Sequence, residues 1–250
     1  MFGFGTSCST AVAVAAGAAA GAAVTWYALT RAKSAGVVAA GAPEKAGATN
    51  VHWHAGAVTR ADRWGKLGQK GAIVWLTGLS GAGKSTVAYA VERDLLDRGC
   101  VAYILDGDNL RHTLNSDLGF SPEDRAENVR RVAHLASILA DAGIIVLACF
   151  ISPTIKMRTR VRELVTSGRD PVHFAECFVD APLAVAEGRD PKGLYKKARK
   201  GEIKHFTGID APFEAPPKPE LHLETASMSL QQEVDAVIDY LRAQQLVKSA

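Results

Sequence analysis

The sequence predicts an α/β fold in which a parallel sheet of about five strands is flanked by helices. Three observations carry this prediction. Short apolar runs alternate along the chain with stretches of helical periodicity, and one apolar run leads directly into a glycine-rich loop. The chain has 250 residues, of which 48% are hydrophobic and 22% charged, so it can build one large core with an appendage.

Residues 1–49 are predicted to be a targeting or membrane-anchor segment with a linker, and residues 50–250 a folded domain. The stretch 11–29 holds no charged residue and is long enough to span a bilayer, but alanine and glycine contribute little transfer energy. Three interpretations stay open: a membrane anchor, a plastid-like organellar transit peptide and a disordered alanine-rich tail. An anchor would make membrane contact through residues 11–29 and keep the domain on the cytoplasmic or stromal side.

The charge distribution argues against nucleic-acid binding. The net charge is +3, and residues 51–250 hold 26 basic against 25 acidic side chains. Duplex affinity comes largely from neutralising phosphates, for which a nearly neutral body offers no general basis. The four cysteines show no metal-ligand spacing, and Cys149 and Cys177 lie in apolar runs that are typical of buried thiols in a reducing compartment.

The first predicted strand is AIVWLT at residues 72–77, and a helical pattern follows its glycine loop as far as Arg98. Four further apolar runs predict strands at residues 101–105, 144–151, 174–179 and 221–223. Helices are expected at residues 129–142 and 183–188, and near the C-terminus, where apolar residues recur at helical spacing from residue 230 to 241. In such a sheet, ligands gather at the carboxyl ends of the strands.

The motif GLSGAGKS at residues 78–85 fits the phosphate-binding pattern G-x-x-x-x-G-K-[ST] with no mismatch. Its glycines let successive backbone N–H groups converge on phosphate oxygens, and the following helix N-terminus adds positive potential. Lys84 would supply a charge to the β/γ-phosphates, and the Ser85 hydroxyl would complete the coordination of Mg²⁺. The residues assigned to nucleotide binding in this loop are Gly78, Leu79, Ser80, Gly81, Ala82, Gly83, Lys84, Ser85 and Thr86.

Polar residues directly follow the second predicted strand. The run DGDNLRH places Asp106, Asp108, Asn109 and Arg111 at its carboxyl end, beside the phosphate loop. Carboxylates there can orient Mg²⁺ or a substrate hydroxyl. The structural alternative is that Asp108 or Asn109 caps the next helix. Ser152 likewise follows the third predicted strand.

Two further segments have both a functional and an ordinary structural interpretation. The run FSPEDRAENVRR puts Arg125 and Asn128 three residues apart on a helix face, for which solvent exposure is the ordinary explanation. Residues 190–210 form a basic run with aromatics that is either a solvated helix or a lid over bound nucleotide. This run contains Lys192, Tyr195, Lys196, Lys197, Arg199, Lys200, Lys204 and Phe206.

Together and in this order, GLSGAGKST, ILDGDNLRH, LGFSPEDRAENVRRV, FISP, RDPKGLYKKAR and HFTGID resemble the motifs of adenylylsulfate kinase (APS kinase), over residues 50–246. The resemblance implies a P-loop kinase-like fold with a lid segment, which transfers the γ-phosphate of ATP to the 3′-hydroxyl of adenosine 5′-phosphosulfate (APS). The products are PAPS and ADP, in sulfate activation. It also implies Mg²⁺, the substrates ATP and APS, and a homodimer. The alternatives are another P-loop small-molecule kinase and a membrane-tethered nucleotide-binding module without catalysis.

The resemblance also assigns roles to single residues. Asp108 looks like the carboxylate that positions or deprotonates the 3′-hydroxyl, and Lys84 and Ser152 join it as catalytic residues. Asp106, with Ser85, would support the metal. Arg189 would lie against the ATP adenine.

The remaining assignments concern APS, whose adenine would lie between Phe120 and Phe206. Arginine suits the phosphosulfate because its planar fork can hold anionic oxygens bidentately. The residues assigned to APS are Asp106, Asp108, Arg111, Phe120, Arg125, Asn128, Ile151, Ser152, Lys192, Gly193, Leu194, His205, Phe206 and Thr207.

The chain departs from the family pattern at two of these positions. Family members continue the serine motif as SPYR or SPHR, whereas this chain has SPTIKMR, so Lys156 or Arg158 is expected to substitute for a missing arginine. His205 stands where glycine is common before the lid phenylalanine, and it is expected to stiffen the lid or add a pH-sensitive contact.

Overall fold

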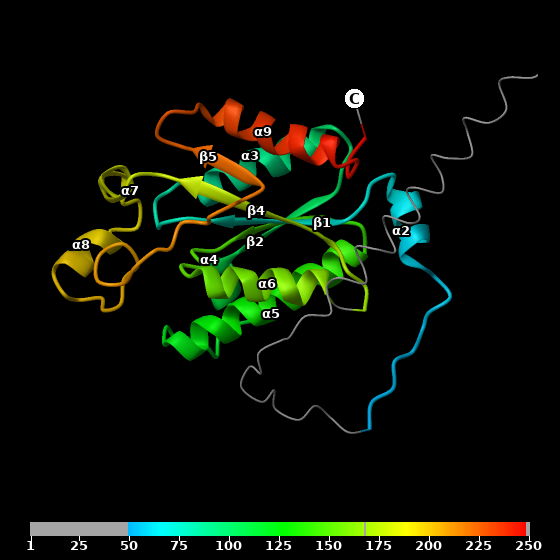
Figure 1. Ribbon diagram of the computed structural model, residues 1–250, viewed down its shortest axis with the longest axis horizontal. Coiled ribbons are helices and arrows are strands. Elements are labelled where there is room, and N and C mark those ends of the chain that lie inside the picture. Colours follow the sequence, from blue (N-terminus) through cyan, green and yellow to red (C-terminus); the bar gives the residue numbers. More distant parts are fainter. Residues whose placement is uncertain (1–49, 168, 249–250) are drawn as a thin grey trace, which may run out of the picture. The chain divides into compact units, whose positions relative to one another are not determined.

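The computed structural model describes residues 50–167 and 169–248, and contacts within the chain group Gly56 onward into one compact unit. Figure 1 shows how its helices and strands are arranged. They follow one another as α2 (Arg60–Leu67), β1 (Ala72–Thr77), α3 (Lys84–Asp97), β2 (Ala102–Asp106), α4 (Gly107–Arg111), α5 (Pro122–Asp141), β3 (Ile145–Cys149), α6 (Ile155–Thr166), β4 (His173–Asp180), α7 (Leu183–Arg189), α8 (Leu194–Arg199), β5 (Leu221–Glu224) and α9 (Leu230–Ala243).

The five strands of the described residues form one parallel sheet in the order β2-β3-β1-β4-β5. β1 lies at the centre, where Ala72 is in register with Ile145 of β3 and with His173 of β4. Helices cover both faces of the sheet (Figure 1). The predicted α/β fold with a parallel sheet of about five strands is therefore confirmed.

The central strand explains why the sheet has two helical layers. Successive side chains of a strand point to opposite faces. Val74 and Leu76 of β1 accordingly share a buried cluster with α3 and α9, whereas Ile73 and Trp75 share one with α5 and α6. Because both faces are covered, β1 is an uninterrupted apolar run, which is typical of parallel sheets.

The predicted strands agree with the observed ones to within two residues at each end, but the helices agree less well. α5 begins at Pro122, before the predicted start at residue 129, because Ser121 caps the helix and proline is favoured in the first turn. α2 and α6 are not among the predicted helices. α2 is eight residues long and buries none of them, and α6 buries only Arg158, Val161 and Val165, so buried apolar positions are few in both.

The predictions for the N-terminal segment, including the anchor, the transit peptide and the membrane contact of residues 11–29, lie outside the described residues. Within residues 50–167 and 169–248, none of the helices combines the length and the apolar character needed to cross a bilayer. Cys149 and Cys177 are buried with free thiols, as their apolar surroundings predict.

Candidate active site

The parallel strands bring the predicted site residues to one edge of the sheet. β1 ends at Thr77 and continues into the phosphate loop, while the neighbouring β3 is followed by Ile151 and Ser152. Beyond β3, β2 ends at Asp106. Segments that are far apart in the sequence therefore meet at the carboxyl ends of adjacent strands, where ligands of such sheets bind.

The phosphate loop turns through three glycines with positive φ, at 153° for Gly78, 73° for Gly81 and 108° for Gly83. A Cβ atom on Gly78 would lie 2.2 Å from the carbonyl oxygen of Val179, and one on Gly81 would lie 2.7 Å from that of Ala186. Glycine is therefore required at both positions for the loop to pass close to β4 and α7.

Lys84 is the first residue of α3, and its side chain folds back over the loop. Nζ donates hydrogen bonds to the carbonyl oxygens of Gly78, at 3.0 Å, and Leu79, at 2.7 Å. Burial lowers the pKa of the Lys84 ammonium group to about 8, and the positive charge of Lys192 acts in the same direction. Anionic oxygens close to this ammonium group would oppose that shift.

Ser85 and Asp106 join the phosphate loop to the end of β2. Ser85 Oγ donates to Asp106 Oδ2 at 2.7 Å, and Asp106 Oδ1 accepts the backbone N–H of Asp108 at 2.9 Å. Asp106 is thus the N-cap of α4, so the alternative that Asp108 or Asn109 caps this helix is wrong.

Ser85 and Asp106 also offer hard oxygen donors of the kind that Mg²⁺ accepts. Within residues 50–167 and 169–248, no group of three or more His, Cys, Asp or Glu residues is arranged to hold a metal. Mg²⁺ in nucleotide sites keeps several waters and binds the phosphates, so it needs few protein ligands.

Asp108 connects α4 with the loop that precedes α8. Its exposed carboxylate forms an ion pair with Nζ of Lys192, and this hydrogen bond raises the pKa of Lys192. Gly193 and Leu194 follow Lys192, with Gly193 at a φ of 66° as the N-cap of α8. The predicted catalytic carboxylate and the start of the predicted lid therefore touch across the site.

Arg111, Phe120 and Arg125, which are assigned to APS, lie close together where α4, the start of α5 and residue 205 meet. The guanidinium carbon of Arg111 is 4.2 Å from the centroid of the exposed Phe120 ring. Arg125 donates from Nε to the Phe120 carbonyl at 3.0 Å and from Nη2 to the His205 carbonyl at 3.1 Å. Arg125 therefore ties the segment before α5 to the segment that follows α8.

Residues 206–211 form a turn, in which the Phe206 carbonyl accepts the N–H groups of Ile209, Asp210 and Ala211. His205 has a φ of 56°, in the left-handed region that favours the glycine common here in the family. Asp210 holds the turn by accepting the N–H groups of His205 and Phe206. Thr207 has a buried hydroxyl without a hydrogen-bond partner in the described part of the chain. The assignment of Thr207 to APS stays a prediction.

Asn128 lies in the protein interior. It is 5% exposed, and its Oδ1 accepts a hydrogen bond of 2.8 Å from Nδ2 of Asn115, which is fully buried. The interpretation of this helix face as an exposed surface is therefore wrong for Asn128. α5 turns Asn128 toward the core.

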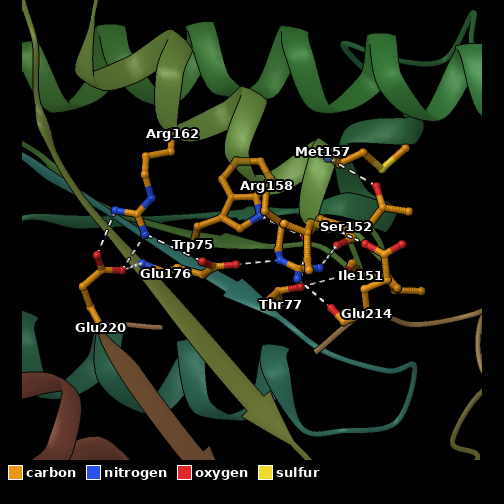
Figure 2. Close-up of polar contacts among 12 residues, drawn as sticks. Trp75, Thr77, Ile151, Ser152, Met157, Arg158, Arg162, Glu176, Glu214 and Glu220 are labelled. Atoms are coloured by element: carbon orange, nitrogen blue, oxygen red, sulfur yellow. Dashed lines mark hydrogen bonds and ion pairs between the residues drawn. The ribbon is translucent and has the colours of Figure 1, made fainter. Parts of the chain in front are cut away.

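Ser152 is 4% exposed, and its hydroxyl is held by two protein partners (Figure 2). Ser152 Oγ accepts the indole N–H of Trp75 at 3.1 Å and donates to Thr77 Oγ1 at 3.0 Å. Thr77 in turn donates to the carbonyl oxygen of Ile151 at 2.7 Å. The Ser152 hydroxyl is therefore engaged within the protein, and both roles assigned to Ser152 stay predictions.

Arg158 does not fill the place of the missing arginine. It is 2% exposed, and its guanidinium group is bound by Glu176 and by the carbonyl oxygens of Ser152 and Glu214 (Figure 2). The expectation of a substitute is therefore wrong for Arg158. Lys156 is exposed and stays a prediction.

Thr225 and Tyr195 support the phosphate loop, although neither is among the predicted site residues. Arg189 donates to Thr225, at 3.1 Å to Oγ1 and 2.7 Å to the carbonyl, and Thr225 Oγ1 donates to the Ala82 carbonyl at 2.8 Å. Tyr195 donates from Oη to the Ser80 carbonyl at 2.9 Å, and burial raises its pKa to about 12. Thr225 directly follows β5, so the rule that places ligands at carboxyl ends would have pointed to it.

Comparison with known proteins gives a consistent result. The family described as Adenylylsulphate kinase matches residues 70–224, which include every predicted site residue. The adenylyl-sulfate kinase of Marinobacter nauticus is 52% identical over 201 residues, covering 80% of this chain and 99% of its own length. That of Clostridium acetobutylicum is 53% identical over 199 residues, covering 80% of this chain and 97% of its own length.

A solved structure agrees with the sequence relatives. The Mycobacterium tuberculosis APS kinase CysC, in complex with AMPPNP and APS, superposes with a TM-score of 0.67 and 53% sequence identity. The superposition covers 70% of this chain and 99% of that chain. On these matches and on the site described above, the chain belongs to the adenylylsulphate kinase family.

Proposed function

We propose that this protein transfers the γ-phosphate of ATP to the 3′-hydroxyl of APS, forming PAPS and ADP. One observation carries the proposal. The phosphate-loop hydroxyl of Ser85 is hydrogen-bonded to Asp106, and Asp106 caps the short helix that carries Asp108. A triphosphate on the loop and a hydroxyl at Asp108 would thus be neighbours, as in-line transfer requires.

The donor side of the site fits ATP. Glycines shape the phosphate loop, and Lys84 stands at the start of α3. Arg189 is linked to the loop by its hydrogen bond to Thr225. The Mycobacterium tuberculosis relative at 53% identity was solved with AMPPNP and APS, which supports a site for two nucleotides in this chain too.

Mg²⁺ fits the donor set of this site. Ser85 Oγ and Asp106 Oδ2 lie 2.7 Å apart, and both are oxygen donors. When bound, Mg²⁺ neutralises charge on the phosphate oxygens during transfer. The protein's own role is to hold and orient the ion and the phosphates. Ser85 offers its hydroxyl, Asp106 its carboxylate, and Lys84 a positive charge.

Asp108 is the proposed base and orienting group. In the reaction, the 3′-oxygen bonds to the γ-phosphorus while the bond to the bridging oxygen of ADP breaks, and Asp108 receives the hydroxyl proton. Lys192 holds the same carboxylate. The substrate hydroxyl must therefore share Asp108 with Lys192 or displace it, which couples substrate entry to the loop before α8.

The experiment is an assay of PAPS formation by the full chain with ATP, Mg²⁺ and APS. The variant Asp108→Asn should lose about 100-fold or more in kcat while its affinity for ATP stays near that of the wild type. Asp97→Asn is the matched control, because Asp97 pairs with Arg93 at the far end of α3. A wild-type protein that binds ATP but makes no PAPS would refute the proposal, and phosphorylation of another small-molecule acceptor would favour the first alternative.

Two further proposals concern organisation. We propose that residues 50–250 form the catalytic domain, with residues 1–49 as an appended segment, and that the protein is a homodimer. Light scattering of the purified chain would measure its mass in solution, and a monomeric mass would contradict the dimer.

A further inference from the structure

We propose that Arg158 is a positioning residue for APS: it fixes the turn at Ser152 and ties this turn to the backbone at Glu214. The inference rests on the proposed function for its substrate. Its structural part, the link between two segments of the site, stands on contacts within the chain.

Arg158 lies on α6, and three of its N–H groups reach three different partners (Figure 2). Nη1 donates to the carbonyl oxygen of Ser152 at 2.8 Å, and Nη2 donates to that of Glu214 at 2.6 Å. Nε donates to the carboxylate of Glu176 on β4 at 2.6 Å. The planar fork of arginine can serve three acceptors at once, whereas an ammonium group cannot reproduce that geometry.

The two segments are also joined directly. The N–H of Glu214 donates to the Pro153 carbonyl at 2.8 Å, and the Glu214 carboxylate accepts the N–H of Ile155 at 2.7 Å. Residues 152–155 and residue 214 therefore form a backbone junction, and Arg158 binds carbonyl groups on both sides of it. Removal of the guanidinium group would leave two carbonyl groups of that junction without this donor.

The turn at Ser152 needs such support. Ser152 has a φ of 36°, in the left-handed region that residues with a side chain rarely adopt. Conformations of this kind persist where the surroundings hold them. Trp75 and Thr77 hold the Ser152 side chain, and Arg158 holds its carbonyl, so both ends of the residue are fixed.

The buried charge of Arg158 has its counter-charge in Glu176, whose side chain is almost as buried. A buried ion pair contributes little net stability, because desolvation offsets the attraction. Such a pair is better explained by the geometry that it fixes. On one side of the junction lies the Ile151–Ser152 backbone, and on the other the chain that leads back to Phe206 and Thr207, all assigned to APS.

The test compares Arg158→Lys with Arg162→Lys. Arg162 lies on the same helix and pairs with Glu220 at 2.8 and 2.7 Å. It also approaches the carboxylate of Glu176 at 3.7 Å, but within residues 50–167 and 169–248 it makes no hydrogen bond to the carbonyl oxygens of Ser152 and Glu214 that Arg158 holds (Figure 2). Arg158→Lys should raise the KM for APS about ten-fold or more, because small misplacements at a site are costly, while the KM for ATP stays within about two-fold. Arg162→Lys should change neither constant.

Amide hydrogen exchange provides a second readout that needs no substrate. The N–H groups of Ile155 and Glu214 should exchange faster in Arg158→Lys than in the wild type, and at wild-type rates in Arg162→Lys. If Arg158→Lys does not fold, the double variant Arg158→Met with Glu176→Leu removes both charges and serves in its place.

Unchanged exchange, or faster exchange with an unchanged KM for APS, would overturn the inference. A wild-type chain that makes no PAPS would refute the proposed function, and the exchange rates would still report on the link.

Discussion

Lys84 shows how its surroundings tune a single residue. Its ammonium group is enclosed by the loop that it serves and donates to the carbonyl oxygens of Gly78 and Leu79. Burial lowers its pKa to about 8, so the group loses charge as the pH rises through that value. Phosphate oxygens favour the charged form and would raise the pKa again. Binding of a nucleotide and protonation of Lys84 are therefore linked.

This linkage predicts proton uptake when the nucleotide binds. At pH 9, Lys84 is mostly neutral, and binding of ATP with Mg²⁺ should take up most of one proton from the buffer. At pH 7 it is already charged, so uptake by Lys84 should be close to zero. Calorimetric titration in two buffers of different ionisation enthalpy measures the difference.

Variants locate that proton. Lys84→Arg should bind without uptake at pH 9, because arginine stays charged, whereas Lys66→Met, a change on the exposed side of α2, should keep the uptake. Equal uptake by the wild type at both pH values would show that Lys84 is not the linked group.

At the scale of residues, the sequence predicted positions better than contacts. The phosphate-loop motif located Lys84 and Ser85 because a chemical pattern of fixed spacing defines it. The expectation for Asn128 is wrong because periodicity in a charged helix does not reveal which polar side chain is paired inside the protein. The expectation for Arg158 rests on the family's serine motif, which does not reveal its buried partners either. Burial of a polar group depends on partners from other elements, such as Asn115 and Glu176 here.

At the scale of elements, α8 and the phosphate loop are coupled through one side chain. Tyr195 on α8 donates to the Ser80 carbonyl, and its ring meets Phe206 edge-on, with centroids 5.0 Å apart and planes at 78°. Asp190 holds the start of α8 by accepting the N–H of Tyr195 at 3.2 Å. The phosphate loop, which is proposed to bind ATP, and Phe206, which is assigned to APS, thus both contact the buried Tyr195.

The variant Tyr195→Phe separates these two contacts, because it removes the hydroxyl and keeps the ring. Loss of the bond to Ser80 should cost about 1 kcal/mol of folding free energy and weaken ATP binding by up to about ten-fold. Tyr103→Phe on the edge strand β2, where the side chain is exposed, is the control and should change neither. Thermal unfolding and nucleotide titration measure both effects, and an unchanged ATP affinity in Tyr195→Phe would contradict the coupling.

The elements also show which signals a sequence carries. The strands are predictable because they are buried on both faces and therefore read as continuous apolar runs. α2 is only eight residues long and mostly polar, so its apolar residues are too few to predict a helix by themselves. Its ends are nevertheless written in the sequence as a capping box between Thr59 and Asp62 and a left-handed Gly68. Capping signals would have located this helix where periodicity could not.

At the scale of the whole molecule, α2 fastens the beginning of the folded unit to the amino end of the sheet. Arg60 and Arg63 both bind the carboxylate of Asp141, at 2.7 and 2.5 Å, and Trp64 donates to the Ala140 carbonyl at 3.3 Å. These partners lie at the end of α5, just before β3 begins. The site lies at the opposite, carboxyl ends of the strands, so α2 should affect stability without affecting chemistry.

Two truncations test this division together with the proposed domain boundary. A chain that starts at residue 50 keeps α2, and its melting temperature and kcat should equal those of the full chain. A chain that starts at residue 69 loses α2 and leaves Asp141 without its two arginine partners. The pairs are partly exposed, so the loss should be about 2 kcal/mol, which lowers the melting temperature by about 4–8 °C in a domain of this size. Its kcat at 25 °C should stay near that of the longer chain.

A loss of activity in the chain from residue 50 would place the boundary further toward the N-terminus. A loss of kcat in the chain from residue 69, measured well below its melting temperature, would show that the amino end of the sheet communicates with the site.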